Sequence, residues 1–127
     1  MRRDLANNIG VVPGLVPAVK STASETGSAI DLQGFESAMV IVNTGAIAGD
    51  GDFGIAIQDS VTGSGDWEAA TKVMGAFPAT LEANSSYRVG YTGSKRYVRI
   101  NVTKEGGTSI ALGAVAVLGH PAVAPVA

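Results

Sequence analysis

Several stretches of the chain alternate apolar with small or polar side chains, and clusters of turn residues separate them. Phe53, Ile55 and Ile57 alternate in this way, and the same period of two recurs over Tyr87–Tyr91 and Val98–Val102. A period of two places alternate side chains on opposite faces of a β-strand. No window keeps the three-and-four spacing of an amphipathic helix free of Gly or Pro. The pattern therefore predicts an all-β chain.

Two segments are apolar at successive positions instead of alternate ones. One is the second half of Phe35–Asn43, and the other is Ile110–Leu118, where Val115 and Val117 make the second face apolar too. Such runs are typical of strands that are covered on both faces. The longer run has roughly nine residues, well short of the ~20 that a membrane-spanning helix needs. We therefore expect buried strands in these segments and no membrane span.

Turn residues divide the chain into about seven or eight strands. The turn clusters lie at Gln33-Gly34, Thr44–Asp52, Ser60–Asp66, Thr92–Lys95 and Glu105–Gly107. Short strands at this spacing predict two antiparallel sheets packed as a β-sandwich, with a jelly roll as one such arrangement. We expect a further strand over Trp67–Val73, and a meander of hairpins from Tyr87 onward.

The beginning of the chain lacks the strand pattern. Pro13 and Pro17, together with neighbouring glycines, interrupt every period there. The sequence therefore predicts an extended, irregular N-terminal arm over residues 1–28, a sandwich domain over 29–121 and a C-terminal tail over 122–127.

Composition indicates a thin core. Apolar residues make up 46% of the 127 residues, but aromatics only 6%, and there are 17 glycines. Small side chains bury little surface each, and association with further subunits would offset this deficit. We therefore expect a homo-oligomer.

Charge and cysteine content narrow the classes of partner and chemistry. The net charge is −2, and the basic residues are scattered apart from Arg2-Arg3 and Lys95-Arg96. A phosphate-binding footprint needs clustered cations, so nucleic acid is not an expected partner. Because the chain has no cysteine, disulfides and thiolate metal sites are excluded.

Residues for catalysis or metal binding are sparse. The single histidine, His120, would have to serve any Ser-His-Asp arrangement, and it lies next to Pro121 at the end of the last apolar run. Asp50-Gly51-Asp52 resembles the opening of a calcium loop but lacks the later ligands, which favours a solvated turn. We predict no catalytic residue, no metal ligand and no cofactor, and hence a protein that is not an enzyme.

Aromatic side chains offer a binding alternative. Trp67 and Tyr91 are aromatic side chains of the kind that stack against sugar rings on a sandwich surface. Tyr91 shares its strand parity with Val89, which equally favours a core position. A carbohydrate-binding module, with Trp67 and Tyr91 as contacts, is therefore the alternative interpretation.

Four segments resemble one class of protein when they are taken in order and at this spacing. They are Asp31–Ala38 (DLQGFESA), Phe53–Ser60 (FGIAIQDS), Lys95–Arg99 (KRYVR) and Gly113–Pro121 (GAVAVLGHP). Together they resemble small virion structural proteins from the head-morphogenesis regions of tailed phages and gene transfer agents. The resemblance covers the chain from about Asn8 onward.

The resemblance implies a β-sandwich attached non-covalently to the head surface, as a capsid decoration or cement protein. A head spike base is the alternative within the same class. The partner would be the major capsid protein or another head protein, and a trimer or pentamer would suit an icosahedral head. We expect the arm to make the capsid or subunit contact through Arg2, Arg3, Leu15 and Val16. The protein would be made in the host cytoplasm and reside in the virion.

Overall fold

The computed structural model describes residues 4–21 and 24–121, which form two packed β-sheets and one short 3-10 helix, Ala6–Asn8. The first sheet has the strand order β1 (Gly10–Lys20), β10 (Ser109–Pro121), β4 (Phe35–Ala48), β8 (Ser86–Tyr91) and β7 (Val73–Met74). The second sheet has the order β2 (Ser24–Thr26), β9 (Tyr97–Gly106), β5 (Asp52–Ser60) and β6 (Glu68–Ala69), and β3 (Ile30–Asp31) also pairs with β9.

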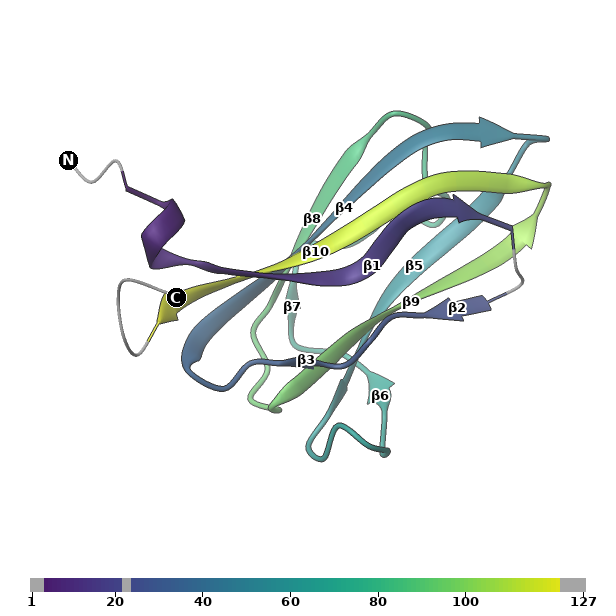
Figure 1. The fold of residues 1–127 in the computed structure, drawn as a ribbon. Helices are drawn as coiled ribbons and strands as arrows, with labels where there is room; N and C mark the ends of the chain where they lie inside the picture. Colours follow the sequence, from purple (N-terminus) through teal and green to yellow (C-terminus); the bar gives the residue numbers. More distant parts are fainter. Residues whose placement is uncertain (1–3, 22–23, 122–127) are drawn as a thin grey trace.

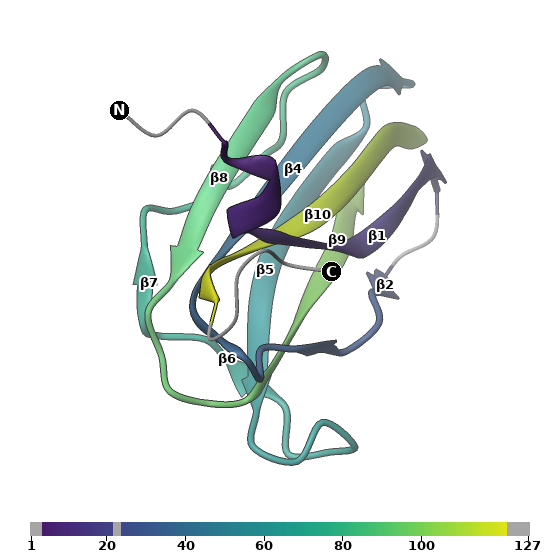
Figure 2. The same cartoon turned by 60° about the vertical axis from the view of Figure 1, so that its left-hand side comes forward.

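The strand order is that of a jelly roll. Every pairing is antiparallel, and the chain crosses between the sheets at β1–β2, β3–β4, β4–β5, β6–β7, β8–β9 and β9–β10. Figure 1 shows β1 and β10 side by side, and in Figure 2 β5 and β9 of the second sheet lie behind β4 and β10 of the first. The predicted all-β sandwich is therefore confirmed, in its jelly-roll form.

The core lies between the sheets and uses the inward face of each long strand. Val40 and Val42 of β4 are at most 1% exposed, as are Phe53 of β5 and Ile100 of β9. Inward side chains at every second position are what the period of two predicts. The other buried apolar side chains come from β1, β3, β5, β8, β9 and β10 and, for Leu81, from the loop before β8: Leu15, Ile30, Ile57, Leu81, Val89, Tyr91, Val98, Val102, Ile110, Leu112, Ala114, Ala116 and Leu118.

The prediction of an irregular N-terminal arm is wrong for Gly10–Lys20. This segment forms β1, an edge strand of the first sheet. Leu15 is 4% exposed and packs in the core, opposite Ala114 of β10. Proline is tolerated on an edge strand because its missing N–H is not needed on the open side. Register shifts on either side of Leu15 accommodate Pro13 and Pro17 in the pairing.

Three further expectations about strands and turns are also wrong. The final three strands do not form a meander, because β9 lies in the second sheet while β8 and β10 lie in the first. Residues 67–73 do not form one strand, since β6 pairs with β5 and β7 pairs with β8. The glycine-rich segment after Asn43 begins as strand, because β4 continues to Ala48. Local alternation does not encode which sheet a strand joins.

Candidate interaction surface

The outer face of the first sheet is apolar across three adjacent strands. Val117 of β10 lies between Val11 of β1 and Met39 of β4, and two residues along, Val115 pairs with Ile41. We call this surface the apolar face, made by Val11, Pro13, Val19, Met39, Ile41, Ala111, Val115 and Val117. Val11 is 61% exposed and Val19 is 68% exposed. Among the described outward positions of β1, β10 and β4, none carries a charge.

The outer face of the second sheet provides an internal comparison. There, Arg99 of β9 donates to Gln58 of β5 at 2.8 Å, and Thr26 of β2 donates to Asn101 of β9 at 3.1 Å. Hydrogen-bonded polar side chains are the usual outer surface of an antiparallel sheet that faces water. The two outer faces of one sandwich thus differ, and the first has the composition of a covered surface.

The apolar face contains a groove beside a ridge. A groove of about 660 Å³ lies between Pro17 and Val19 on one side and Ile41 on the other. Its floor is made of small residues, including Gly45, Ala111 and Gly113. Val115 lines the end of this groove, and the larger side chains of Met39 and Val117 lie beyond it on the same strands and form the ridge. The face therefore has a small-residue half and a large-residue half.

The sequence predicted strands covered on both faces, and the structure covers them on one. The side chains of β4 and β10 that face the second sheet are buried, whereas Met39, Ile41, Val115 and Val117 are only partly buried. The apolar run in each strand was the available signal for this face. The contribution of β1 was missed because its prolines hid the strand.

A polar cluster ties the two sheets together at the end of the sandwich that carries the loop after β8. The Tyr91 hydroxyl of β8 donates to Asp59 Oδ2 of β5 at 2.9 Å and accepts from the Lys95 backbone N–H at 3.3 Å. Lys95 Nζ lies 3.3 Å from Asp59 Oδ1 and 3.0 Å from Glu68 Oε2. Burial, followed by the hydrogen bond to Asp59, raises the pKa of Tyr91. The hydrogen bond to Glu68 is the main cause that raises the pKa of Lys95.

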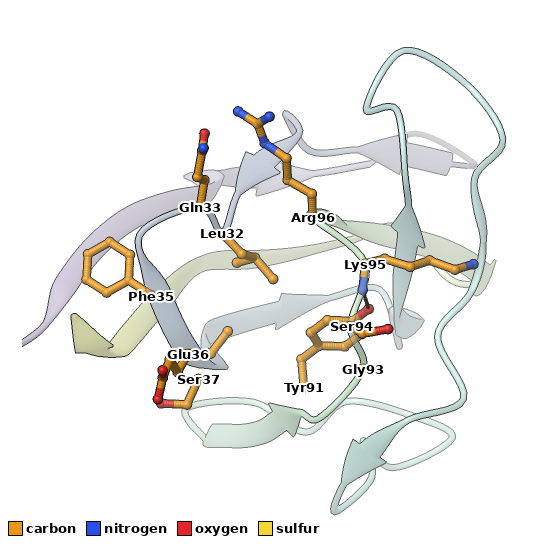
Figure 3. Close-up of a pocket in the computed structure, with 11 residues that line it drawn as sticks. Leu32, Gln33, Phe35, Glu36, Ser37, Tyr91, Gly93, Ser94, Lys95 and Arg96 are labelled. Atoms are coloured by element: carbon orange, nitrogen blue, oxygen red, sulfur yellow. Dashed lines mark hydrogen bonds between the residues drawn. The ribbon is translucent and has the colours of Figure 1, made fainter. Parts of the chain in front are cut away.

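A pocket of about 310 Å³ adjoins this cluster, between Leu32–Ala38 and the loop after β8 (Figure 3). Figure 3 shows the Lys95 and Arg96 side chains extending in different directions. Arg96 makes two hydrogen bonds to Asp31, at 2.9 and 2.8 Å, and this pairing lowers the pKa of Asp31 to about 2. Both cations therefore already bind carboxylates of the chain itself.

The residues expected to contact the capsid differ in whether the structure describes them and in whether their side chains are exposed. Arg2 and Arg3 lie outside the described residues. Leu15 is in the core, so its expected role as a contact is wrong, because a side chain that is 4% exposed cannot reach a partner. Val16, its neighbour, is 71% exposed.

The two aromatic residues of the alternative interpretation do not form a sugar platform. Tyr91 is 5% exposed, so its expected role as a sugar contact is wrong. Trp67 is partly buried, and the Arg99 guanidinium lies 4.3 Å over the centre of its ring. One face of the indole is thus occupied by a cation.

The candidates for chemistry are dispersed. His120 Nδ1 and Ser37 Oγ are 2.7 Å apart on exposed strand ends, and Asp52 accepts a hydrogen bond from Thr80 at 2.9 Å. Over residues 4–21 and 24–121, no three His, Asp or Glu side chains are grouped as metal ligands. In the same residues, no helix is long and apolar enough to cross a membrane.

No protein-family model matches the sequence, and no curated protein matches it. Among solved structures, the chain is similar to one in the structure of the infectious bursal disease virus Gx strain. The two share 12% sequence identity and superpose with a TM-score of 0.49. The alignment covers 92% of this chain and 35% of the viral one, so the chain spans about a third of that chain's length.

Proposed function

We propose that the chain is a virion structural protein that decorates or cements a tailed-phage-type head through non-covalent contacts. The observation that carries the proposal is the apolar face. A small sandwich that exposes Val11, Met39 and Val117 in one continuous, uncharged surface is built for permanent association. The sequence resemblance supports a head as the place of that association.

The chemistry of the rest of the molecule supports a role in binding over one in catalysis. The ionised groups of the Tyr91–Asp59 cluster are hydrogen-bonded to one another across the two sheets. Such a cluster stiffens the sandwich, since each charged group already has a partner. The partners that the sequence resemblance supports are proteins of the head, the major capsid protein or a neighbouring head protein, on the outer surface of the virion.

Jelly rolls build both capsid proteins and lectins, so the fold alone does not separate the two candidate functions. The placement of aromatic side chains favours the first. A sugar platform needs an open aromatic face, and Tyr91 is buried while Arg99 covers one face of Trp67.

A rebinding experiment tests the proposal. Empty heads are purified from cells in which the gene for this chain is deleted, mixed with increasing amounts of the pure protein, and pelleted. We expect co-pelleting that saturates at a fixed ratio near the number of capsomers or capsomer junctions. Saturation at about a dozen pentamers would indicate a spike base at the vertices instead. Protein that stays in the supernatant at every concentration would overturn the proposal.

A further inference from the structure

The apolar face must be covered in the working protein, and the rest of the surface restricts what can cover it. Six large apolar side chains are well exposed among the residues that the structure describes. Val11, Val16 and Val19 lie on β1, Met74 lies on β7, and Leu5 precedes the 3-10 helix that leads into β1. The sixth, Val61, follows β5 of the second sheet. The exposed apolar surface is therefore concentrated on the first sheet.

This concentration bears on symmetry. A trimeric or pentameric ring is held by two different patches on each subunit, and each patch meets the other on the next copy. In a two-fold dimer, one patch meets itself. One apolar patch, with no charge at the described outward positions of β1, β10 and β4, can meet its own copy without repulsion.

The shape of the apolar face is also complementary to itself. Two copies can be placed with their apolar faces together and related by a two-fold axis that lies between the faces, perpendicular to the strands. If the axis passes at the level between Gly113 and Val115, the small-residue half of each face meets the large-residue half of the other. Met39 and Val117 of one copy then lie over Gly45 and Ala111 of the other. Large side chains thus meet the small-residue groove of about 660 Å³. Arg88 of β8 lies at the margin of the face. In this arrangement it lies opposite Ser86 of the other copy, so it meets a hydroxyl and not a second cation.

The area is sufficient for a stable pair. The three long strands β1, β10 and β4, spaced about 4.8 Å apart with about ten residues each at about 3.3 Å, and the six residues of β8 at the margin give a face of roughly 570 Å² per copy. The total of roughly 1,100 Å² is above the area of about 1,000 Å² that a specific interface needs.

From these observations we propose that two copies of this chain pack their first sheets face to face in a two-fold dimer through the apolar face. The inference rests on the proposed function in that it takes the apolar face as a surface of permanent association, and it assigns that surface to a second copy, so that the head is bound through the rest of the dimer. In the dimer, the second sheets and the loops at the ends of both sandwiches remain free to contact the head. The unit that binds the head is then a pair, which suits a junction between two capsomers.

The first test is the mass of the full chain in solution by light scattering. We expect twice the 12.8 kDa of one chain. Ala111→Glu, which puts a charge into the groove, should yield monomers and raise the dissociation constant at least about 100-fold. The matched control is Ala56→Glu, the same substitution at an exposed outward position of the second sheet, which should remain dimeric. A monomeric wild type, a trimer or pentamer, or equal effects of the two variants would overturn the inference.

A cross-linking experiment tests the same pairing even if Ala111→Glu does not fold. The chain has no cysteine, so a Val117→Cys chain and a tagged Ala111→Cys chain can be mixed and treated with a short bis-maleimide. We expect a mixed dimer carrying one of each chain. Replacing the second chain by Ala56→Cys should abolish it, and equal yields from the two mixtures would contradict the proposed axis.

The two proposals fail in different ways. A dimer that does not bind heads would leave the inference standing and remove the proposed function. A chain that binds heads but is monomeric in solution and does not cross-link would support the proposed function and overturn the proposed dimer.

Discussion

The hydroxyl of Tyr91 in the first sheet donates a hydrogen bond of 2.9 Å to the carboxylate of Asp59 in the second sheet, and both residues are at most 5% exposed. This bond joins the two layers of the sandwich at the end where Lys95 completes the cluster. A buried carboxylate requires such donors, because an unsatisfied charge in the interior is costly. The polar cluster is therefore a structural link between the sheets, and its removal should be measurable.

Tyr91→Phe should lower the free energy of unfolding by about 1–3 kcal/mol, because it leaves a buried carboxylate oxygen without its donor. Urea-induced unfolding followed by fluorescence measures the change. Tyr87→Phe removes the same hydroxyl from a site where it accepts from the Glu82 N–H in an exposed loop. That control should cost less than about 0.5 kcal/mol. Equal losses for the two variants would show that Asp59 does not depend on Tyr91.

Strand β1 can be tested by truncating two adjacent side chains. Leu15→Ala should destabilise the protein by about 2–5 kcal/mol, since Leu15 is in the core, whereas Val16→Ala should be nearly neutral. Thermal unfolding of both variants measures the difference. Similar melting temperatures for the two would mean that Gly10–Lys20 does not belong to the sandwich.

The ion pair between Asp31 and Arg96 predicts a dependence on pH. The pKa of Asp31 is lowered to about 2 from an ordinary value of 3.8, so its contribution is fully present above pH 3.8 and is lost as the pH falls toward 2. Both side chains are nearly half exposed, so screening by solvent keeps the contribution of the pair to stability small. Asp31→Asn should remove the part of the fall in the free energy of unfolding between pH 4 and pH 2 that this ion pair causes.

Arg96→Gln serves as the partner variant for this prediction. It should remove the same segment of the pH dependence, because the first cause of the lowered pKa is the hydrogen bond from Arg96. If the free energy of unfolding keeps its wild-type dependence on pH in both variants, the role given to the Asp31–Arg96 pair is contradicted.

A glycan array tests the carbohydrate alternative. We expect no binding that depends on Trp67, because Arg99 covers one face of its ring and Tyr91 is buried. The array is probed with the wild type and with Trp67→Ala. Signals that appear with the wild type and vanish with the variant would favour a sugar-binding module over the proposed head protein.

The sequence predicted the elements with strong local alternation and missed those that depend on distant pairing. Strands over Phe53–Gln58, Tyr87–Tyr91 and Val98–Val102 are confirmed within β5, β8 and β9. The prediction of a meander failed, because β8, β9 and β10 alternate between the two sheets of the jelly roll. β1 was missed because proline usually ends a strand, and its tolerance here depends on an edge position that sequence does not reveal.

For the candidate site too, the sequence predicted what depends on a local pattern and missed what depends on packing against distant strands. The successive apolar positions around Ile41 and Val115 signalled two apolar faces, but the expectation that both are covered holds for only one of them within this chain. Tyr91 offered two interpretations, core or sugar contact, and its burial beside Asp59 decides for the core. Exposure depends on which strand packs opposite, which no local pattern encodes.

The proposed virion role is tested most directly by counting this chain in native particles. Particles are purified on density gradients from the cells that encode the protein, and mass spectrometry quantifies it against the most abundant capsid chain. The proposal predicts a fixed ratio across fractions, release by denaturant as an intact 12.8 kDa chain, and loss of the signal from deletion-strain particles. Particles that band normally and contain none of this chain would contradict the account.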